Sequence, residues 1–266
     1  MSDSASPANQ KDSVARTFLV AFGVCLVCAI FVCAAAVQLK SVQLVNQELD
    51  RQVNILKAAG LVDAAASPDK DAVMAMFERI DTKYVDLDSG EYVEAPVEPY
   101  NMMKLAKDPE FSMVLEPDAD QAKIKRRINV AQIYIAKDEQ GEVESVILPV
   151  NGYGLWSTLY GFLALSADGS EVVGLGFYQH AETPGLGGEV DNPKWKSLWP
   201  GKQVFNEDGD VALSVIKGAV DPSSRYKEYQ VDGLAGATLT TRGVDNLIQF
   251  WLGDMGFGPF LDNLRG

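Results

Sequence analysis

The fold is decided by a stretch of alternating sequence that begins at Val130-Ala-Gln-Ile-Tyr-Ile-Ala136. Four later runs share its richness in β-branched and aromatic residues, which is typical of strands. Turns containing glycine follow several of these runs, as in hairpins, and long helices do not alternate with them. The sequence therefore predicts an α+β domain, an antiparallel sheet or half-barrel packed by helices. The further strands are expected at 143–150, 159–165, 172–178 and 212–216.

Upstream of this domain, residues 17–39 carry no charge and are bounded by Arg16 and Lys40. A helix of this length extends about 34 Å, enough to cross a hydrocarbon core of roughly 30 Å. We predict a transmembrane helix over 17–39 after a short tail, 1–16. A cleaved signal peptide is the alternative, because Ala34-Ala-Ala36 has A-x-A spacing, although the run exceeds a usual signal core. The Lys and Arg counts on the two sides do not decide the orientation.

Between the span and the sheet domain, residues 40–128 are expected to form a membrane-proximal part. Apolar spacing predicts an amphipathic helix over 42–59 that ends at Gly60. A second helix should begin at the N-cap Ser67, with Pro68 in its first turn, and run to about Ile80. We then expect a hairpin over 84–93, followed by a loop over 94–127 with helical turns near 119–127. The sheet domain occupies 129–266.

The charge balance and the scarcity of histidine exclude several functions. The chain has 23 Lys and Arg against 37 Asp and Glu, a net charge of −14, so a nucleic-acid partner is not expected. His180 is the only histidine, which excludes a multi-histidine metal site. We predict no metal ligand and no catalytic acid–base pair. Cys25, Cys28 and Cys33 all lie within the span, where they are expected to act as small apolar residues.

Two glycine-rich segments are typical of ligand loops rather than strands. Residues 151–161 combine three glycines with three aromatic residues, and residues 180–188 read His-Ala-Glu-Thr-Pro-Gly-Leu-Gly-Gly. Such loops suit a heteroaromatic ligand with donors and acceptors. Neither completes G-x-G-x-x-G, and no phosphate-loop lysine motif occurs. The candidate contacts are Leu155, Trp156, Ser157, Glu182, Thr183, Leu186 and Gly187, with Lys217 as a weaker candidate.

A third segment, residues 232–245, leads into a helix that should continue to Leu252 and end at Gly253. Thr240 or Thr241 is expected as the N-cap. Thr238 would then precede the helix, beside the small residues Gly236 and Ala237. Arg242 would lie in the first turn, where a cation is disfavoured unless an anion is bound. A helix start of this kind is a ready phosphate site.

The run Asp232 to Thr240, D-G-L-A-G-A-T-L-T, resembles the flavinylation motif of the FMN-binding domain family. In that family the threonine of G-A-T carries FMN through a phosphoester, which corresponds to Thr238 here. Ala235 departs from the motif, since the family usually has Ser or Thr at this position. Together with the span, residues 46–61, 154–165 and 180–188 make nearly the whole chain similar to the C-subunit family of sodium-translocating NADH:quinone oxidoreductases.

The resemblance implies an electron carrier that relays single electrons through covalent FMN, with no complete activity alone. We predict that Gly236, Ala237, Leu239 and Thr240 bind the cofactor. Trp156 and Leu186 are expected to supply apolar contacts to the flavin ring, and Glu182 and Thr183 its polar edge. The resemblance also implies a bacterial inner-membrane protein with a periplasmic C-terminal domain, other subunits as partners and a flavin transferase for maturation. Two alternatives stay open: the flavin-bearing G subunit of the ferredoxin:NAD oxidoreductase complex, and a membrane-anchored binding module without redox activity.

Overall fold

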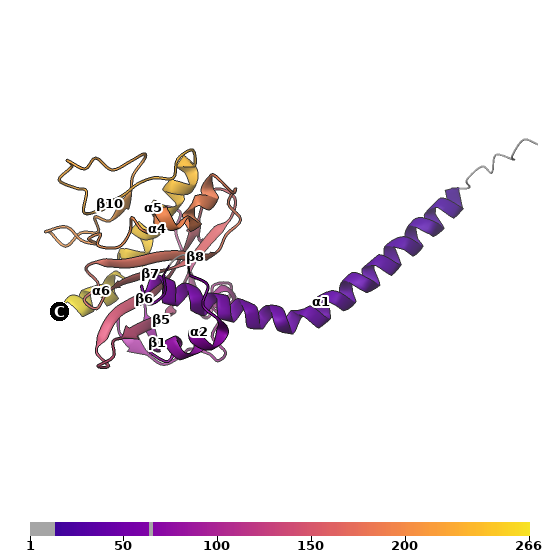
Figure 1. The fold of residues 1–266 in the computed structure, drawn as a ribbon, viewed down its shortest axis with the longest axis horizontal. Helices are drawn as coiled ribbons and strands as arrows, with labels where there is room; N and C mark the ends of the chain where they lie inside the picture. The colour runs from indigo at the N-terminus through magenta and orange to yellow at the C-terminus, as the bar shows by residue number, and fades with distance from the viewer. Residues whose placement is uncertain (1–13, 64–65) are drawn as a thin grey trace, which may run out of the picture. The chain divides into compact units, whose positions relative to one another are not determined.

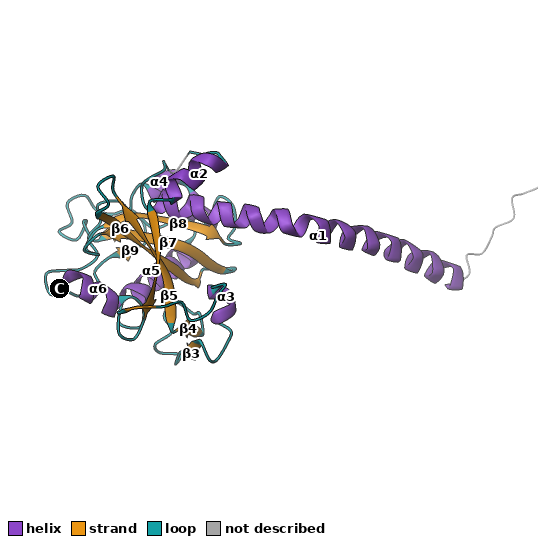
Figure 2. Ribbon diagram, turned by 90° about the horizontal axis from the view of Figure 1, so that it is seen from below, coloured by secondary structure: helices purple, strands orange, loops and turns teal. Residues whose placement is uncertain are grey.

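The structure, a computed structural model, describes residues 14–63 and 66–266. Its centre is a six-stranded antiparallel sheet in the order β2-β1-β5-β6-β7-β8, seen across the middle of Figures 1 and 2. The predicted α+β class with an antiparallel sheet is confirmed. The strands of this sheet are β1 (Ile80–Asp86), β2 (Tyr92–Val93), β5 (Val130–Lys137), β6 (Val143–Tyr153), β7 (Thr158–Ser166) and β8 (Val172–Gln179).

The period-two pattern divides the side chains of the sheet between two apolar layers. Along β5, Ile133 and Ile135 belong to the larger core, whereas Tyr134 and Ala136 belong to a second, smaller core. The same alternation continues on β6 and β7, so both faces of these central strands are buried. The sheet therefore has packed elements on each face, and a shift of one residue in register would exchange the two layers.

The strands β6 and β7 are longer than predicted. The segment 151–161, expected to be a glycine loop, is mostly strand: Tyr153 pairs with Thr158, and only residues 154–157 form the turn between them. Gly154 N–H donates to the carbonyl of Ser157 across this turn at 2.9 Å. The glycine content of the segment misled the prediction, because Gly152 and Gly161 lie in strands where a side chain would meet neighbouring atoms at 2.5 Å.

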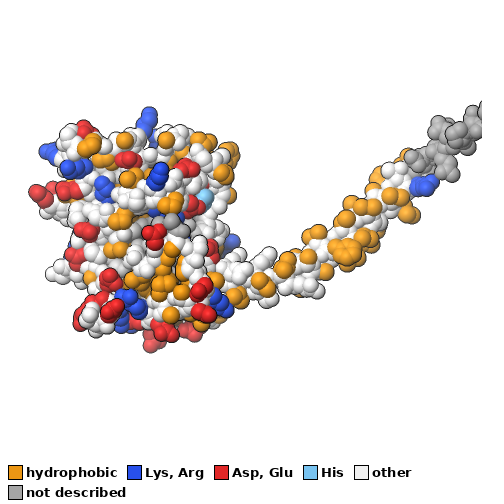
Figure 3. Space-filling view, viewed as in Figure 1, with side chains coloured by type: hydrophobic (Ala, Val, Ile, Leu, Met, Phe, Trp, Pro, Cys, Tyr) orange, Lys and Arg blue, Asp and Glu red, His pale blue; other side chains and the backbone are white. Residues whose placement is uncertain are grey.

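The predicted span and the amphipathic helix form one continuous helix, α1 (Val14–Ala58), which ends before Gly60 (φ +72°) as expected. Its apolar part is long enough to cross a membrane and is exposed, as the hydrophobic side chains along it in Figure 3 show. The chain divides into two compact units, Met1–Glu48 and Leu49–Gly266. Within the second unit, the buried Ile55, Leu56 and Ala58 pack in the smaller core.

The second helix, α2 (Lys70–Phe77), is capped by Asp69, whose carboxylate accepts the N–H of Ala72 at 2.9 Å. The prediction of Ser67 as its cap was therefore wrong. The helix also ends before Ile80, because Ile80 begins the strand β1 paired with β5. The predicted hairpin that follows is confirmed, with Tyr84 opposite Val93.

The segment 94–127 contains more regular structure than predicted. It holds a short helix, α3 (Met102–Leu105), and a small antiparallel pair, β3 (Ser112–Val114) with β4 (Arg126–Ile128). The helical turns expected near 119–127 are wrong at Arg126 and Arg127, which lie in β4. The Asp120 carboxylate accepts the N–H groups of Ile124 and Lys125, each at 2.8 Å, and this shapes the loop before β4.

The strand predicted at 212–216 is only two residues long and lies outside the main sheet. It is β9 (Ser214–Val215), and it pairs in parallel with β10 (Gln230–Val231), so its expected antiparallel pairing was wrong. Between β8 and β9, a 3-10 helix, η1 (Gly187–Asp191), leads into α4 (Pro193–Lys196). The side chains of Trp195 and Trp199 contact each other and are buried in the larger core, which packs this region against the domain.

The chain ends with α5 (Thr238–Leu252) and α6 (Gly258–Arg265). The helix α5 packs against β6, and its buried face includes Val244, Leu247 and Ile248. It begins three to four residues earlier than predicted, at Thr238, and Ala237 occupies the N-cap without a side-chain hydrogen bond. The prediction of Thr240 or Thr241 as the cap was therefore wrong, and Arg242 lies beyond the first turn.

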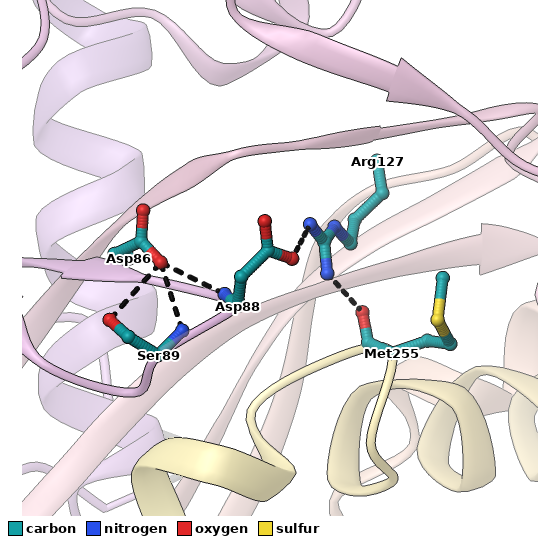
Figure 4. A network of polar contacts seen from close by, with 5 residues as sticks. All are labelled: Asp86, Asp88, Ser89, Arg127 and Met255. Atoms are coloured by element: carbon teal, nitrogen blue, oxygen red, sulfur yellow. Dashed lines mark hydrogen bonds and ion pairs between the residues drawn. The ribbon is translucent and has the colours of Figure 1, made fainter.

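A buried arginine joins the first hairpin to the end of the chain, as Figure 4 shows. The Arg127 side chain is 2% exposed; Nη2 lies 2.5 Å from Asp88 Oδ1, and Nη1 donates to the carbonyl of Met255 at 3.2 Å. Asp86 Oδ1 accepts the N–H groups of Asp88 and Ser89, which fixes the turn that presents Asp88. The arginine thus connects β4, the β1–β2 turn and the α5–α6 connection.

Candidate functional site

The candidate site is organised around one buried carboxylate, Glu182, in the loop after β8. Its Oε1 accepts the N–H groups of Leu155 and Trp156 at 3.0 Å and that of Ser157 at 3.3 Å. Its Oε2 accepts the hydroxyl of Thr240, in the first turn of α5, at 2.7 Å. One side chain that is 5% exposed therefore connects three segments: the β6–β7 turn, its own loop and the start of α5.

The hydrogen bonds keep this carboxylate ionised. Burial on its own would raise the pKa of Glu182, but the bonds from the Thr240 hydroxyl and from the N–H groups of Trp156, Leu155 and Ser157 outweigh it. The pKa of Glu182 therefore lies below its ordinary value. Two glycines leave room for the carboxylate: a Cβ on Gly154 would lie 2.6 Å from Oε1, and a Cβ on Gly187 would lie 2.7 Å from Oε2.

The loop that carries Glu182 is held at both ends. Ser157 Oγ accepts the N–H of Ala181 at 2.7 Å, and the Thr183 carbonyl accepts the N–H groups of Leu186 and Gly188 at 3.1 and 2.9 Å. His180 Nε2 lies 2.7 Å from Asp191 Oδ2, and its Nδ1 accepts the N–H of Glu182 at 3.2 Å. His180 is thus a framework residue of this loop.

Asp191 carries the negative charge on the other side of His180. Burial on its own would raise the pKa of Asp191, but the hydrogen bond to His180 and the nearby charge of Lys196 outweigh it and lower that pKa. Lys196 Nζ lies 3.2 Å from Asp191 Oδ1. The group therefore ties the loop to α4.

The third segment is built on Asp232 and Gly233. The Asp232 carboxylate accepts the N–H of Val220 at 2.8 Å, and its carbonyl accepts Trp195 Nε1–H at 2.8 Å. A Cβ on Gly233 would lie 2.3 Å from the carbonyl of Ile216, so this position requires glycine. The contacts fix the loop of residues 216–220 against the start of the segment, and that loop carries the exposed side chain of Lys217.

The three threonines at the start of α5 have different environments. Thr240 is buried and donates to Glu182, and Thr241 is buried with its Oγ1 accepting the N–H of Leu234 at 3.0 Å. Thr238 is exposed, and no hydrogen bond within the described part of the chain uses its hydroxyl. Among these three, only the Thr238 hydroxyl is available to a ligand or an enzyme.

Exposed apolar side chains lie on the segments that Glu182 joins. Trp156 is 65% exposed and Leu155 37% on the β6–β7 turn, Leu186 is 45% exposed on the Glu182 loop, and Leu239 is 53% exposed beside Thr238. A Cβ on Gly236 would lie 3.2 Å from Leu186 Cδ2, which places this loop against the G-A-T segment. Large apolar groups grouped on a surface in this way mark an interaction site.

The predicted site residues occupy two kinds of position. Ser157, Glu182 and Thr240 form the framework beneath the site, and their side-chain polar atoms are hydrogen-bonded within the protein. Gly187 belongs to the same framework, because it leaves room for the Glu182 carboxylate. Leu155, Trp156, Thr183, Leu186, Gly236, Thr238 and Leu239 are exposed around it, Ala237 is buried as the N-cap of α5, and Lys217 lies on the neighbouring loop.

Sequence reasoning did not single out Gly154 and Gly243 as packing positions. A Cβ on Gly154 would overlap the Glu182 carboxylate, and a Cβ on Gly243 would lie 2.5 Å from the Tyr153 carbonyl. Gly243 lies on the helix face that meets the β6–β7 turn. A glycine inside a predicted helix is the sequence signal that could have indicated this close contact.

Comparison with known proteins agrees with this geometry. The FMN-binding domain family matches residues 154–253, which include all three segments. The chain is 54% identical to the C subunit of the Na(+)-translocating NADH-quinone reductase of Pseudomonas aeruginosa, over 97% of this chain and 98% of that protein. It is 45% identical to the corresponding protein of Vibrio alginolyticus, over 97% and 98%. The crystal structure of Shewanella oneidensis NqrC matches with a TM-score of 0.72 at 34% identity, covering 80% of this chain and 95% of that one.

Proposed function

The chain belongs to the C-subunit family of Na(+)-translocating NADH-quinone reductases, and from this premise we propose that it carries FMN covalently on Thr238. It is the electron-carrying, FMN-binding subunit of that respiratory complex and acts together with the other subunits. Family membership decides against the two alternatives, the G subunit of the ferredoxin-linked complex and a module without redox activity. Bound FMN supplies the redox chemistry, because a flavin accepts and passes on single electrons.

The observation that carries the proposal is that the Thr238 hydroxyl is exposed and forms no hydrogen bond within the described part of the chain. Formation of a phosphoester needs a hydroxyl that an enzyme can reach, and Thr238 is exposed whereas Thr240 and Thr241 are buried and hydrogen-bonded. Gly236 and Ala237 precede it and add little bulk. Ala235, where the family usually has Ser or Thr, is exposed and does not change the access to Thr238.

The start of α5 supports a phosphate at this position. The N–H groups of Thr238, Leu239 and Thr240 belong to the first turn and have no partner one turn earlier in the helix. The positive end of the helix dipole favours an anion there. These three N–H groups would hold the phosphate oxygens, and the positive φ of Gly236 (+74°) lets the chain turn into the helix beside them.

The exposed apolar side chains support a flavin ring at the same place. Trp156 and Leu186 would contact the ring, and Leu155 and Leu239 would shield its edges from water. Thr183, which is exposed, would contact the polar edge of the ring. Glu182 would not touch the ring, because both of its carboxylate oxygens are already used. It would instead place a fixed negative charge beneath the site.

Maturation and topology complete the proposal. The protein is associated with the membrane through α1. We propose that residues 40–266 lie in the periplasm and that a separate flavin transferase attaches FMN there. Labelling of a cysteine introduced at the exposed Asp208 tests the orientation. A thiol label that crosses the outer membrane but not the inner membrane should react with this cysteine in intact cells. Labelling that requires permeabilisation of the inner membrane would contradict the proposal.

The test of the acceptor is co-expression with a flavin transferase, followed by in-gel flavin fluorescence after denaturation. Thr238→Ser keeps a hydroxyl and should retain fluorescence, whereas Thr238→Ala should lose it with an unchanged melting temperature. Intact mass should show the addition of FMN less one water only where fluorescence persists. Fluorescence in Thr238→Ala would contradict the assignment of Thr238.

A further inference from the structure

A cavity that is separate from the site around Thr238 lies between α3, the loop before β4 and the strands β6 and β7. Its volume is about 570 Å³, within the range of small-molecule sites. Figure 2 shows α3 and the β3–β4 pair on the same side of the domain. None of the residues proposed to contact FMN lines this cavity.

The cavity gathers positive charge in a chain that is strongly acidic. Lys107, Lys123, Lys125 and Arg126 line it, although the whole chain has a net charge of −14. Within the described residues, none of the three lysine side chains forms an ion pair or a hydrogen bond. Arg126 donates only to Ser112, to Oγ at 2.9 Å and to the carbonyl at 2.7 Å, so its charge is not neutralised. Four cations around one cavity, none with an ion-pair partner among the described residues, favour an anionic ligand.

The backbone holds two of these lysines in place. Lys123 and Lys125 are the only described residues other than glycine with positive φ, at 54° and 66°. The Asp120 carboxylate fixes the loop through the N–H groups of Ile124 and Lys125. The loop therefore presents both lysines in a conformation that side-chain-bearing residues rarely adopt.

Most of the remaining lining is apolar or aromatic, and Asn151 and Thr158 are its polar members. Met102 and Met103 come from α3, Tyr153 and Tyr160 from β6 and β7, and Trp251 from α5. Thioether and aromatic groups adapt to flat or flexible apolar bodies. The lining thus combines an anion-binding side with an apolar side.

We propose that this cavity binds an organic phosphate, with the phosphate held by the lysines and Arg126 and an apolar body held by the methionines and tyrosines. A phosphate suits the site because Arg and Lys together satisfy its several oxygens. The apolar body could come from an aromatic ring or from a lipid chain. Tyr153 and Thr158 line the cavity and also flank the β6–β7 turn, which contains Trp156. A ligand in the cavity would therefore be adjacent to the turn that we propose contacts FMN.

Isothermal titration of the purified full chain in a neutral detergent tests the proposal with two probes. These are 1-naphthyl phosphate, for an aromatic source, and dihexanoyl phosphatidylglycerol, for a lipid source. Saturable binding of either supports the site and identifies the source. Inorganic phosphate and 1-naphthol should each bind at least about tenfold more weakly than the matching probe, because each lacks one half of the ligand.

Variants then locate the binding. Lys123→Asn with Lys125→Asn removes both charges and suits positive φ, and it should weaken binding at least about tenfold. The double arginine variant at these positions keeps the charges and should retain binding. Lys104→Gln is the matched control, because Lys104 lies on α3 but does not line the cavity. Failure of both probes to saturate, or equal binding by the asparagine variant, would overturn the proposal. Thr238→Ala should bind the probe normally, which separates this result from the flavin assignment.

Discussion

At the scale of single residues, Glu182 determines how the candidate site is assembled. Its four hydrogen bonds come from backbone and side-chain donors on two other segments, and no ion pair within the described part of the chain involves it. A buried carboxylate can stay ionised only when several donors replace its water. The role of Glu182 is therefore structural and electrostatic, beneath the site instead of at its polar edge.

Glu182→Gln should lower stability at neutral pH and flatten its dependence on acid. Because the pKa of Glu182 is lowered in the folded state, the charge stabilises the fold above about pH 4.5, and this contribution is lost as pH falls through the folded-state pKa. A glutamine offers one acceptor oxygen for the same donors, so the expected loss at pH 7 is about 1–3 kcal/mol.

Urea unfolding between pH 3 and 7 measures this effect, with Glu139→Gln as the control. Glu139 is exposed in a hairpin turn and makes no side-chain hydrogen bond within the described residues. The wild type and the control should lose stability in parallel, and Glu182→Gln should lose less on acidification. Equal pH slopes for all three proteins would contradict the role assigned to Glu182.

At the scale of elements, the Arg127 contact connects the β1–β2 turn, β4 and the α5–α6 connection. The arginine is buried, whereas the Asp88 side chain is 73% exposed. Much of the pair's attraction is therefore screened, but removal of Asp88 would leave a buried cation with only the Met255 carbonyl as its described partner. Asp88 therefore stabilises the contact between these elements mainly by providing a partner for the buried charge of Arg127.

Asp88→Ala should lower stability by about 1–2 kcal/mol, less than for a fully buried pair because of this screening. Adding Arg127→Met removes the buried charge and should restore part of the lost stability. The double variant should therefore lose less stability than the two single variants lose together. Thermal or urea unfolding of all four proteins measures the coupling. Strict additivity would show that the two side chains do not interact.

At the scale of the whole molecule, the end of α1 belongs to the folded domain. Ile55, Leu56 and Ala58 are buried in the smaller core with Tyr134 and Phe162 of the sheet. Gly174 on β8 allows this approach, since a Cβ there would lie 2.5 Å from the Ala58 carbonyl. The covering of one sheet face therefore depends on the helix that also carries the span.

A chain that begins at Leu49 should fold and remain soluble without detergent, whereas one that begins at Gly60 should be destabilised by more than about 4 kcal/mol. The shorter form loses Ile55 and Leu56 from the core, each worth about 2 kcal/mol or more. Circular dichroism melting curves of the two forms measure the difference. Equal melting temperatures would show that the last turns of α1 do not stabilise the sheet.

The sequence predicted what local patterns encode and missed what distant contacts decide. Alternation at residues 130–136 and the turn at Asp88 led to the strands and the first hairpin correctly. A threonine before a helix is a usual cap, so the pattern predicts that role for Thr240 or Thr241. The actual partner of Thr240, Glu182, is 58 residues away and cannot be found from a local pattern. The two-residue pair β9–β10 was too short for its parallel direction to be read from alternation.

The wide sequence separation of the contacts around Glu182 has a consequence for folding. Its partners are 25 to 27 residues away on the β6–β7 turn and 58 residues away on α5. Closing such loops costs chain entropy that only the packed sheet repays, so the surroundings of Thr238 cannot form as an independent local unit. The proposed modification site at Thr238 therefore forms only together with the packed core of the domain. A transferase that recognises this surface would therefore modify folded chains and would not modify unfolded ones.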